Sequence, residues 1–304
     1  MRVFVTGATG FVGSAVVREL IEAGHEVTGL ARSDEAAAAL AAAGAAVHRG
    51  SLDNPDSLRR GAAAADGVIH AAFIHNYADL TAAGETDRLA IEAIGAGLAG
   101  SGRPLVVTSV IGHLTPGQLA TEDTAPDPEA SVKHRAGSEQ AALALADQGV
   151  RVSVLRLPLS VHGEGDTGFV PGLIQLARRK GISAYPGDGL NRWPAVHRLD
   201  AAQLYRLALE GAPAGTTLHA IGDEGVPLME IAGVIGARLG LPVVSLPSEE
   251  AAEHFGWLAH FVSLDIPASS FKTQALLDWQ PVHPALLPDL DQEHYYTTNT
   301  HRNG

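Results

Sequence analysis

The chain has 304 residues, 46% of them apolar, which suffices for one large or two modest domains with a buried core. It has no cysteine, which excludes disulfides, thiolate catalysis and cysteine-based metal sites. Its formal net charge of −13, with acids spread along the chain, argues against a nucleic-acid partner. No stretch approaches the ~18 to 20 apolar residues of a membrane helix, and the first residues predict a strand rather than a signal peptide, so we expect a cytoplasmic protein without a membrane partner.

The first segment, RVFVTGATGFVGSAVVREL, joins a strand to a helix through three glycines. Residues 3–5 begin an apolar run typical of a strand buried on both faces, and apolar residues then recur at helical spacing until Gly24. Such a turn directs free backbone N–H groups and the positive end of the helix dipole at one point, which suits a phosphate. Gly7 permits backbone angles that a side chain forbids, Gly10 lets a ligand approach, and Gly13 lets the helix pack on the strand. We therefore predict a nucleotide-binding turn; the alternative is a tight turn that only needs small residues.

Strands and helices alternate through the N-terminal half. The expected strands cover residues 25–33, 45–54, 67–73, 104–110 and 150–158, and the expected helices cover 34–44, 55–65, 84–100 and 132–148. Ser33 or Asp34 is placed to cap the first of these helices, and Asn54 with Pro55 opens the second. This alternation predicts right-handed crossovers and a parallel sheet covered on both faces. The fold class is therefore α/β, a Rossmann-type doubly wound parallel sheet.

The C-terminal half is less regular. Residues 186–200 carry the Gly, Pro and Asn of a loop, and Asp200 is positioned to cap a helix at 201–210. A strand follows at 216–222 and a helix at 228–240. The 14 histidines form no HExxH motif and no short His-x-His set with acids, so we predict no metal site.

Several segments carry a family resemblance. Thr6-Gly7-Ala8-Thr9-Gly10-Phe11-Val12-Gly13 resembles the TGxxGxxG fingerprint of the extended short-chain dehydrogenase/reductase superfamily, the NAD(P)-dependent epimerase/dehydratase group. Other segments lie where that family places them: VIHAAF, VVTSV, RLPLSVHGEGD, NRWPAVHRLDAA and LLDWQPVHPALLPDL. The resemblance spans nearly the whole chain, and it implies a second, smaller α/β region that binds substrate.

The domain boundaries follow from this comparison. We expect a dinucleotide-binding domain at 1–165 with return segments near 190–220, a substrate-binding region formed by 166–190 and 221–291, and a flexible tail at 292–304. A homodimer is common in the family and is possible here, although nothing in these residues demonstrates one.

The resemblance also implies a set of cofactor contacts. These are Thr6, Gly7, Thr9, Gly10, Phe11, Val12, Gly13, Arg32, Ser33, Ser51, Leu52, Ala71, Ala72, Phe73, Thr108, Pro158 and Leu159. Arg32 ends the second strand, where NAD-specific sites place an acid, and a guanidinium there suits a 2′-phosphate. NADP is therefore favoured, and NAD stays possible because Asp34 follows. Ser51 stands where the family usually has an acid, which leaves the adenine contact open.

The catalytic pattern departs from the family. Ser109, or Thr108 beside it, is placed to hold a substrate oxygen at the end of the strand at 104–110. The family's YxxxK pair is missing: the alignment puts Arg135 at the Tyr position and Glu139 at the Lys position. Because an arginine does not release its proton near neutral pH, the ordinary mechanism cannot run with this pair.

Three other residues are candidate proton donors. His134 is the expected acid and base, since an ordinary imidazole pKa near ~6.5 suits proton exchange at neutral pH, and Arg135 would steady the oxyanion. His75 and Tyr77, in the loop after the fourth strand, are rivals. The plain alternative is that the basic cluster at the start of this helix is only exposed.

Asn191, Trp193 and His197 give the clearest substrate-side pattern, with two polar groups beside a flat apolar ring. Trp193 either walls the pocket or fills the seam between the two regions. The best-supported function is an NAD(P)-dependent oxidoreductase acting on a small carbonyl or hydroxyl compound. An epimerase or dehydratase that retains its cofactor, and a dinucleotide-binding sensor without catalysis, are the alternatives.

Overall fold

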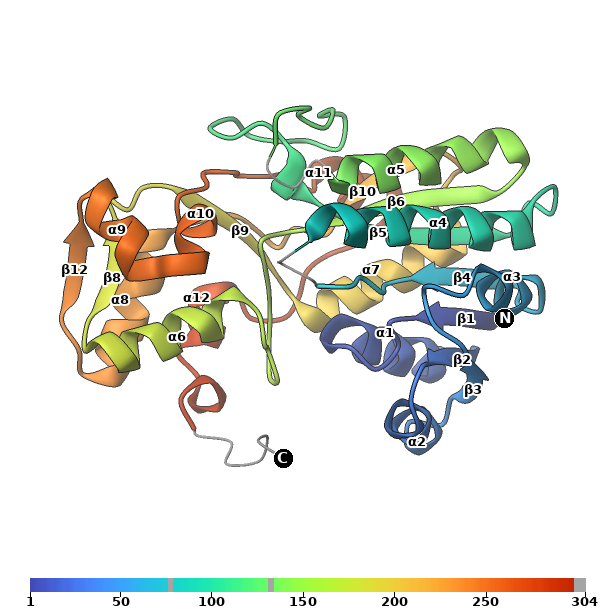
Figure 1. The fold of residues 1–304 in the computed structure, drawn as a ribbon, viewed down its shortest axis with the longest axis horizontal. Coiled ribbons are helices and arrows are strands. Elements are labelled where there is room, and N and C mark those ends of the chain that lie inside the picture. The colour runs from blue at the N-terminus through green and yellow to red at the C-terminus, as the bar shows by residue number, and fades with distance from the viewer. Residues whose placement is uncertain (76–78, 131–133, 298–304) are drawn as a thin grey trace.

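A seven-stranded parallel sheet forms the larger half of the computed structural model, which describes residues 1–75, 79–130 and 134–297 (Figure 1). The strands lie in the order β10-β6-β5-β4-β1-β2-β3. Their bounds are β1 Arg2–Thr6, β2 Glu26–Ala31, β3 Ala46–Arg49, β4 Gly67–His70, β5 Pro104–Val110, β6 Arg151–Leu157 and β10 Thr216–His219. The predicted α/β class with a Rossmann-type doubly wound parallel sheet is confirmed.

Helices cover both faces of this sheet. They are α1 Phe11–Glu22, α2 Asp34–Ala42, α3 Pro55–Ala63, α4 Leu80–Leu98, α5 His134–Ala144, α7 Arg198–Gly211 and α11 Phe271–Leu277. The apolar side chains of α3, α4 and α5 form one core with one face of the strands, and those of α1 and α7 form another with the opposite face. The strands β1, β4, β5 and β6 are mostly buried because each face packs against helices, whereas β3 at the edge is largely exposed. Among the described residues, no helix is long and apolar enough to cross a bilayer.

The direction of winding reverses between β1 and β4, which lie side by side. From β1 the chain continues to β2 and β3 on one side, and from β4 it continues to β5 and β6 on the other. In open α/β sheets, ligands bind at the carboxyl ends of the strands at such a reversal. We therefore expect a ligand-binding site at the carboxyl edge of the sheet, near Thr6, Ala71 and Ser109.

The smaller half is built on two short sheets and surrounding helices (Figure 1). One sheet has the order β11-β9-β7 and the other pairs β12 with β8. The elements are β7 Ser160–His162, α6 Phe169–Lys180, β8 Ser183–Pro186, β9 Arg192–His197, β11 Asp223–Pro227, α8 Leu228–Leu239, β12 Val243–Leu246, α9 Ser248–Phe255, α10 Ala259–Val262 and α12 Leu286–Leu290. Short 3-10 turns are η1 Ile111–His113, η2 Leu145–Gln148, η3 Gly256–Leu258 and η4 Glu293–Tyr295. The helices α6, α8, α9, α10 and α12 and the strands β8, β9, β11 and β12 share a core of their own, and the boundaries of a separate substrate-binding region stay a prediction.

Two helix caps were predicted correctly. The Ser33 hydroxyl accepts a hydrogen bond from Ala36 N at 3.2 Å, and Asn54 Oδ1 accepts one from Ser57 N at 3.1 Å. Each side chain thereby satisfies an N–H group that the first helical turn leaves free.

Two local expectations were wrong, and a third is tested only in part. The predicted loop at 186–200 contains β9, because Trp193–Val196 are buried between β7 and β11 despite their loop-like composition. Asp200 does not cap α7: His197 is the cap, and Asp200 lies inside the first turn. The tail expected to be flexible at 292–304 begins with the 3-10 turn η4, where Gly163 N donates a hydrogen bond to the Tyr295 hydroxyl at 3.1 Å, and its residues 298–304 lie outside the described residues.

Candidate active site

The glycine-rich turn between β1 and α1 has geometry that requires glycine at two positions. Gly7 has φ +69°, and a Cβ there would lie 2.7 Å from Ala72 N. A Cβ on Gly13 would lie 2.0 Å from the Gly7 oxygen, so the start of α1 can pack on the turn only without a side chain. A Cβ on Gly10 would meet only Gly7 O, at 3.2 Å. The space above Gly10 is open, and the first N–H groups of α1 face it.

The other predicted cofactor contacts lie on the same edge because each follows a strand. Thr6 ends β1, Arg32 and Ser33 follow β2, Ser51 and Leu52 follow β3, Ala71, Ala72 and Phe73 follow β4, Thr108 lies near the end of β5, and Pro158 and Leu159 follow β6. Thr9 and Val12 belong to the glycine-rich turn and α1. The edge is continuous from β3 to β6, which is the span that a dinucleotide needs.

The end of β2 presents a cation. Arg32 is exposed, and Asp34, the acid that kept NAD possible, is engaged by the Arg49 guanidinium, with 2.5 Å between Nη2 and Oδ1. Because the Arg49 charge offsets Asp34, the local charge beside Arg32 is more favourable for an anion than the sequence indicated.

A buried chain of polar side chains connects this turn to α5. The Thr6 hydroxyl lies 2.8 Å from His70 Nδ1, His70 Nε2 lies 3.0 Å from Asp87 Oδ1, and Arg135 Nη1 donates to Asp87 Oδ2 at 2.9 Å. Asp87 is 2% exposed and Arg135 is 5% exposed. Burial raises the pKa of Asp87, but the hydrogen bond with His70 and the charge of Arg135 outweigh it and leave that pKa below its ordinary value.

Arg135 is fixed on its other sides as well. Its Nη2 donates to the Thr108 carbonyl at 2.6 Å, and its guanidinium lies 4.2 Å from the centre of the Phe73 ring. The residue expected to steady an oxyanion therefore donates to Asp87 and to the end of β5 through Nη1 and Nη2, while its buried Nε has no hydrogen-bond partner among the described residues. It supplies positive charge to the site from a fixed place.

Glu139, which the sequence analysis aligned with the Lys of the YxxxK pattern, belongs to a second buried cluster. Arg156 donates to both of its oxygens, at 2.5 and 3.1 Å, and His113 Nε2 lies 3.3 Å from Oε2. Burial raises the pKa of Glu139, but His113 and Arg156 outweigh it and lower that pKa to about 2. Glu139 is thus a charged acceptor at neutral pH and holds no proton to donate. His113, between β5 and the site, is a residue that the sequence reasoning missed.

Ser109 offers an unused hydroxyl at the end of β5. It is 1% exposed, and its Oγ has no hydrogen-bond partner among the described residues. A buried hydroxyl without a partner costs free energy unless a ligand satisfies it. Thr108, its neighbour, is different: its hydroxyl donates to the His70 carbonyl at 2.8 Å and lies 2.6 Å from the Tyr205 hydroxyl.

Two of the three expected proton donors lie around Phe73. The His134 ring is stacked on Phe73 at 6.0 Å between centres, and the His75 ring meets it edge-on at 5.3 Å. Burial, and then the charge of Arg135, lower the pKa of each imidazole. Tyr77 lies outside the described residues. The structure thus brings His134, His75 and Arg135 together beside the end of β5.

Two of the three expected substrate contacts, Trp193 and Asn191, hold the smaller half together. Trp193 is 0% exposed, and its Nε1 donates to the Phe261 carbonyl at 3.1 Å. Asn191 Nδ2 donates to the Val262 carbonyl at 2.7 Å. This placement differs from the expectation of direct contact with substrate: Trp193 fills the core beneath α10, and Asn191 anchors the chain that follows it.

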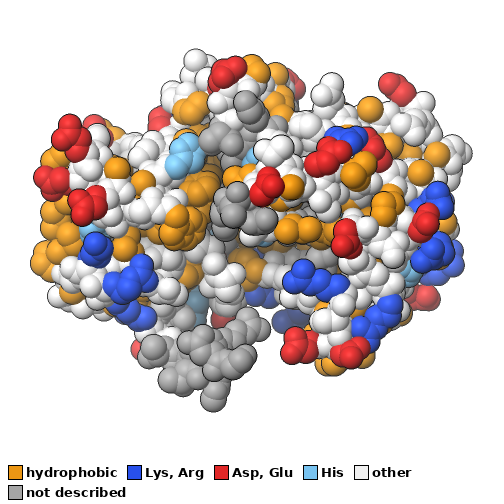
Figure 2. All heavy atoms as spheres, viewed as in Figure 1, with side chains coloured by type: hydrophobic (Ala, Val, Ile, Leu, Met, Phe, Trp, Pro, Cys, Tyr) orange, Lys and Arg blue, Asp and Glu red, His pale blue; other side chains and the backbone are white. Residues whose placement is uncertain are grey.

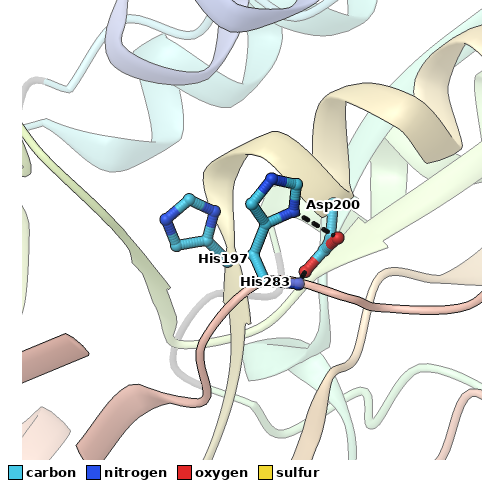
Figure 3. A group of neighbouring side chains, drawn as sticks. All are labelled: His197, Asp200 and His283. Carbon is cyan, nitrogen blue, oxygen red and sulfur yellow. Dashed lines mark hydrogen bonds and ion pairs between the residues drawn. The ribbon is translucent and has the colours of Figure 1, made fainter. Parts of the chain in front are cut away.

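His197 lies in the one group of described residues whose composition could hold a metal ion, with Asp200 and His283 (Figure 3). His283 Nδ1 donates to Asp200 Oδ1 at 2.7 Å, and the backbone N–H groups of Val282 and His283 donate to the same carboxylate at 3.0 and 3.1 Å. His197 stacks on His283 with 11° between the ring planes, and its Nδ1 accepts from Leu199 N. Burial, followed by the charge of His162, lowers the pKa of His197 to about 4, so its ring is neutral at pH 7. The carboxylate already accepts three hydrogen bonds, and the arrangement acts as a clamp between α7 and the C-terminal segment.

Arg198 is a second residue that the sequence reasoning missed. Its guanidinium lies 4.9 Å from the centre of the Phe11 ring, at the start of α1, and its Nη1 donates to the Glu164 carbonyl at 2.7 Å. The pKa of Arg198 is lowered, chiefly by burial and to a smaller extent by the charge of Arg18, although the charge of Glu164 acts in the opposite direction. By contrast, Arg192 has a carboxylate partner that raises its pKa. The signal in the sequence was an arginine directly after β9, in a segment already expected near the site.

Comparisons with known proteins place the chain in a family. The sequence pattern described as the NAD dependent epimerase/dehydratase family matches residues 3–221. Protein C2A9.02 of Schizosaccharomyces pombe is 52% identical over 97% of this chain and 100% of its own length. A 2-alkyl-3-oxoalkanoate reductase of Stenotrophomonas maltophilia is 30% identical over 80% of this chain and 77% of its own.

A solved structure shares the fold. The dTDP-glucose 4,6-dehydratase DesIV of Streptomyces venezuelae, with NAD and TYD bound, matches with a TM-score of 0.79 at 22% identity, over 98% of both chains. At this identity the likeness concerns the arrangement of the elements alone.

Proposed function

Because the chain belongs to the NAD dependent epimerase/dehydratase family, as its fingerprint predicted, we propose that it is an NAD(P)-dependent reductase, with NADP favoured, that acts on a small carbonyl compound. The observation that carries the proposal is the buried, unpartnered Ser109 hydroxyl, two strands from a turn whose glycines leave room for a dinucleotide. The similarity to a reductase supports net reduction of a carbonyl compound rather than the cycle of an epimerase or dehydratase, in which the hydride is returned to the substrate.

The residues at the turn fit a dinucleotide. The N–H groups at the start of α1 would hold the pyrophosphate, Arg32 the 2′-phosphate, and Ala71 and Ala72 the ribose side. We propose that Arg198 also faces the pyrophosphate, because it is a partly desolvated cation beside Phe11 whose hydrogen-bond partner is a backbone carbonyl rather than a carboxylate.

When bound, the nicotinamide supplies the hydride that reduces a carbonyl carbon. The chain must then bind the carbonyl oxygen and provide one proton. Ser109 donates a hydrogen bond to that oxygen from the end of β5. His134 provides the proton, and Arg135, held by Asp87, contributes positive charge without leaving its place. After the product leaves, His134 takes up a proton from solvent, because its ring is half-buried rather than enclosed.

Two arginine variants separate the two phosphate sites. Arg32→Ala should weaken NADPH binding by roughly ten- to a hundredfold and leave NADH binding nearly unchanged, because a charged hydrogen bond to the 2′-phosphate is lost. Arg198→Gln should weaken both cofactors alike, by about tenfold, because both carry the pyrophosphate. Parallel fluorescence titrations of NADPH and NADH measure this. Equal losses of the two cofactors in the Arg32 variant would contradict the 2′-phosphate assignment.

The pH profile identifies the proton donor. Reduction needs protonated His134. Burial and the charge of Arg135 lower the pKa of His134 below the ordinary 6.5, so kcat for reduction should fall as pH rises through that lowered pKa. His134→Gln should lower kcat by roughly 100- to 10,000-fold and remove this dependence while cofactor affinity is kept. His254→Gln, on α9, is the matched control. Activity and pH dependence that survive in His134→Gln would transfer the role to His75 or Tyr77.

A second function is favoured by one observation. Arg135 and Glu139, at the positions that carry Tyr and Lys in the family, are both locked in buried ion pairs, as expected of a protein that binds the dinucleotide without chemistry. Such a sensor would bind NADPH tightly and consume none of it with any carbonyl compound. Net consumption of NADPH also distinguishes a reductase from an epimerase, which returns the hydride.

A further inference from the structure

We propose that the site takes an uncharged carbonyl compound with a flat apolar ring, held against an aromatic surface made of Phe169, Trp257 and Phe261. The proposal rests on the proposed function and names its substrate class. Neither Phe169 nor Phe261 belongs to the sequence-predicted site. They come from the start of α6, from η3 and from α10.

The three rings form one continuous surface. Ring centres lie 4.4 Å apart for Phe169 and Phe261, 6.2 Å for Phe169 and Trp257, and 6.3 Å for Trp257 and Phe261. Trp257 is 60% exposed although it is one of the largest apolar side chains in the chain. Clustered aromatic rings at the surface are typical of a binding site, since stacked rings offer area and orientation together.

The surface is supported from below. Trp193 lies 5.8 Å from Phe169 between ring centres and is fully buried, and its Nε1 holds the backbone of Phe261. Asn191 holds the carbonyls of Val262 and Leu264. Because these contacts fix α10 before any ligand arrives, binding loses little free energy to ordering of the wall.

The surface is connected to the dinucleotide edge. Phe169 directly follows the loop at 163–168, whose Glu164 carbonyl accepts from Arg198 next to Phe11. Leu159, expected beside the nicotinamide, packs in the same core as Phe169 and Phe261. Figure 2 shows hydrophobic side chains gathered on the smaller half where it faces the sheet-bearing half.

The charges around this surface disfavour an anionic substrate. Arg192, next to Trp193, is held by both oxygens of Asp265, at 2.8 and 2.9 Å, which raises its pKa and leaves it paired. Asp166 lies three residues before Phe169 and accepts from Gly168 N at 2.6 Å. A nucleoside diphosphate sugar or a keto acid needs an unpaired cation at this place, and Arg192 is already paired with Asp265.

Calorimetry on the NADP-loaded protein tests the proposal. An aryl methyl ketone should bind at least about tenfold more tightly than the aryl keto acid with the same ring and than UDP-glucose. Phe169→Ala should weaken the ketone roughly tenfold and leave NADPH affinity unchanged, because only the ring contact is lost. Phe271→Ala, at a 76% exposed phenylalanine on α11, is the matched control and should change neither.

The outcomes separate the two proposals. Equal or tighter binding of the keto acid or the sugar nucleotide, or equal effects of the two phenylalanine variants, would overturn the substrate class. Tight, Phe169-dependent binding of the ketone without any oxidation of NADPH would support the substrate class and contradict the reductase function.

Discussion

Replacing Asp87 with alanine is expected to lower the free energy of unfolding by roughly 3–5 kcal/mol, because it leaves the Arg135 cation buried without its partner. Asp87 is 2% exposed and accepts from both Arg135 and His70. Urea denaturation of the wild type and the variant, analysed with a common slope, measures the loss.

The matched control removes the charge pair together. Asp87→Leu combined with Arg135→Met should recover most of the lost stability, since paired apolar replacements of a buried ion pair are often neutral or stabilising. A loss below about 1 kcal/mol in Asp87→Ala would contradict the account, because it would mean that Arg135 reaches water once unpaired.

Gly13→Ala is expected to have the largest effect on cofactor binding. Its Cβ would lie 2.0 Å from the Gly7 oxygen, so the turn and α1 must separate. Overpacking of this kind costs about 1–3 kcal/mol, and because the shift falls on the backbone that faces the pyrophosphate, the dissociation constants of NADPH and NADH should both rise at least about tenfold.

Gly233→Ala is the control for this variant. Gly233 lies inside α8, where a Cβ meets nothing within 4 Å, so alanine should stabilise the helix by about 0.4–1 kcal/mol and leave cofactor binding unchanged. Thermal unfolding and cofactor titration of both variants measure the contrast. Unchanged cofactor affinity in Gly13→Ala would mean that this turn does not bind the dinucleotide.

The glycine-rich turn that we propose as the dinucleotide site could be predicted from the sequence because its signals are local. Gly7 and Gly13 lie six residues apart within one strand, turn and helix, and their roles depend on that short segment alone. The parallel order follows from alternating elements of ordinary length. Ser109 could be placed because it ends a strand.

The contacts that fix the polar groups could not be predicted, because they join distant segments. Arg135 and Asp87 are 48 positions apart, and the sequence does not show that the arginine forms an ion pair with this residue of α4. Trp193 was expected in a loop; its burial depends on β7 and β11, which pair with β9 from different parts of the chain. Phe169 and Phe261 form a surface only after those strands are in place.

The measurement that tests the central claim most directly is a single turnover with protein in excess over NADPH. NADPH bound to the protein is mixed with an uncharged aryl ketone, and the loss of nicotinamide absorbance is compared with the amount of alcohol formed. The account predicts that the two amounts are equal, that Ser109→Ala slows the loss sharply, and that NADPH remains bound in that variant. Bound NADPH that persists unchanged with every carbonyl compound tried would contradict the reductase function and identify the protein as a binder of the dinucleotide.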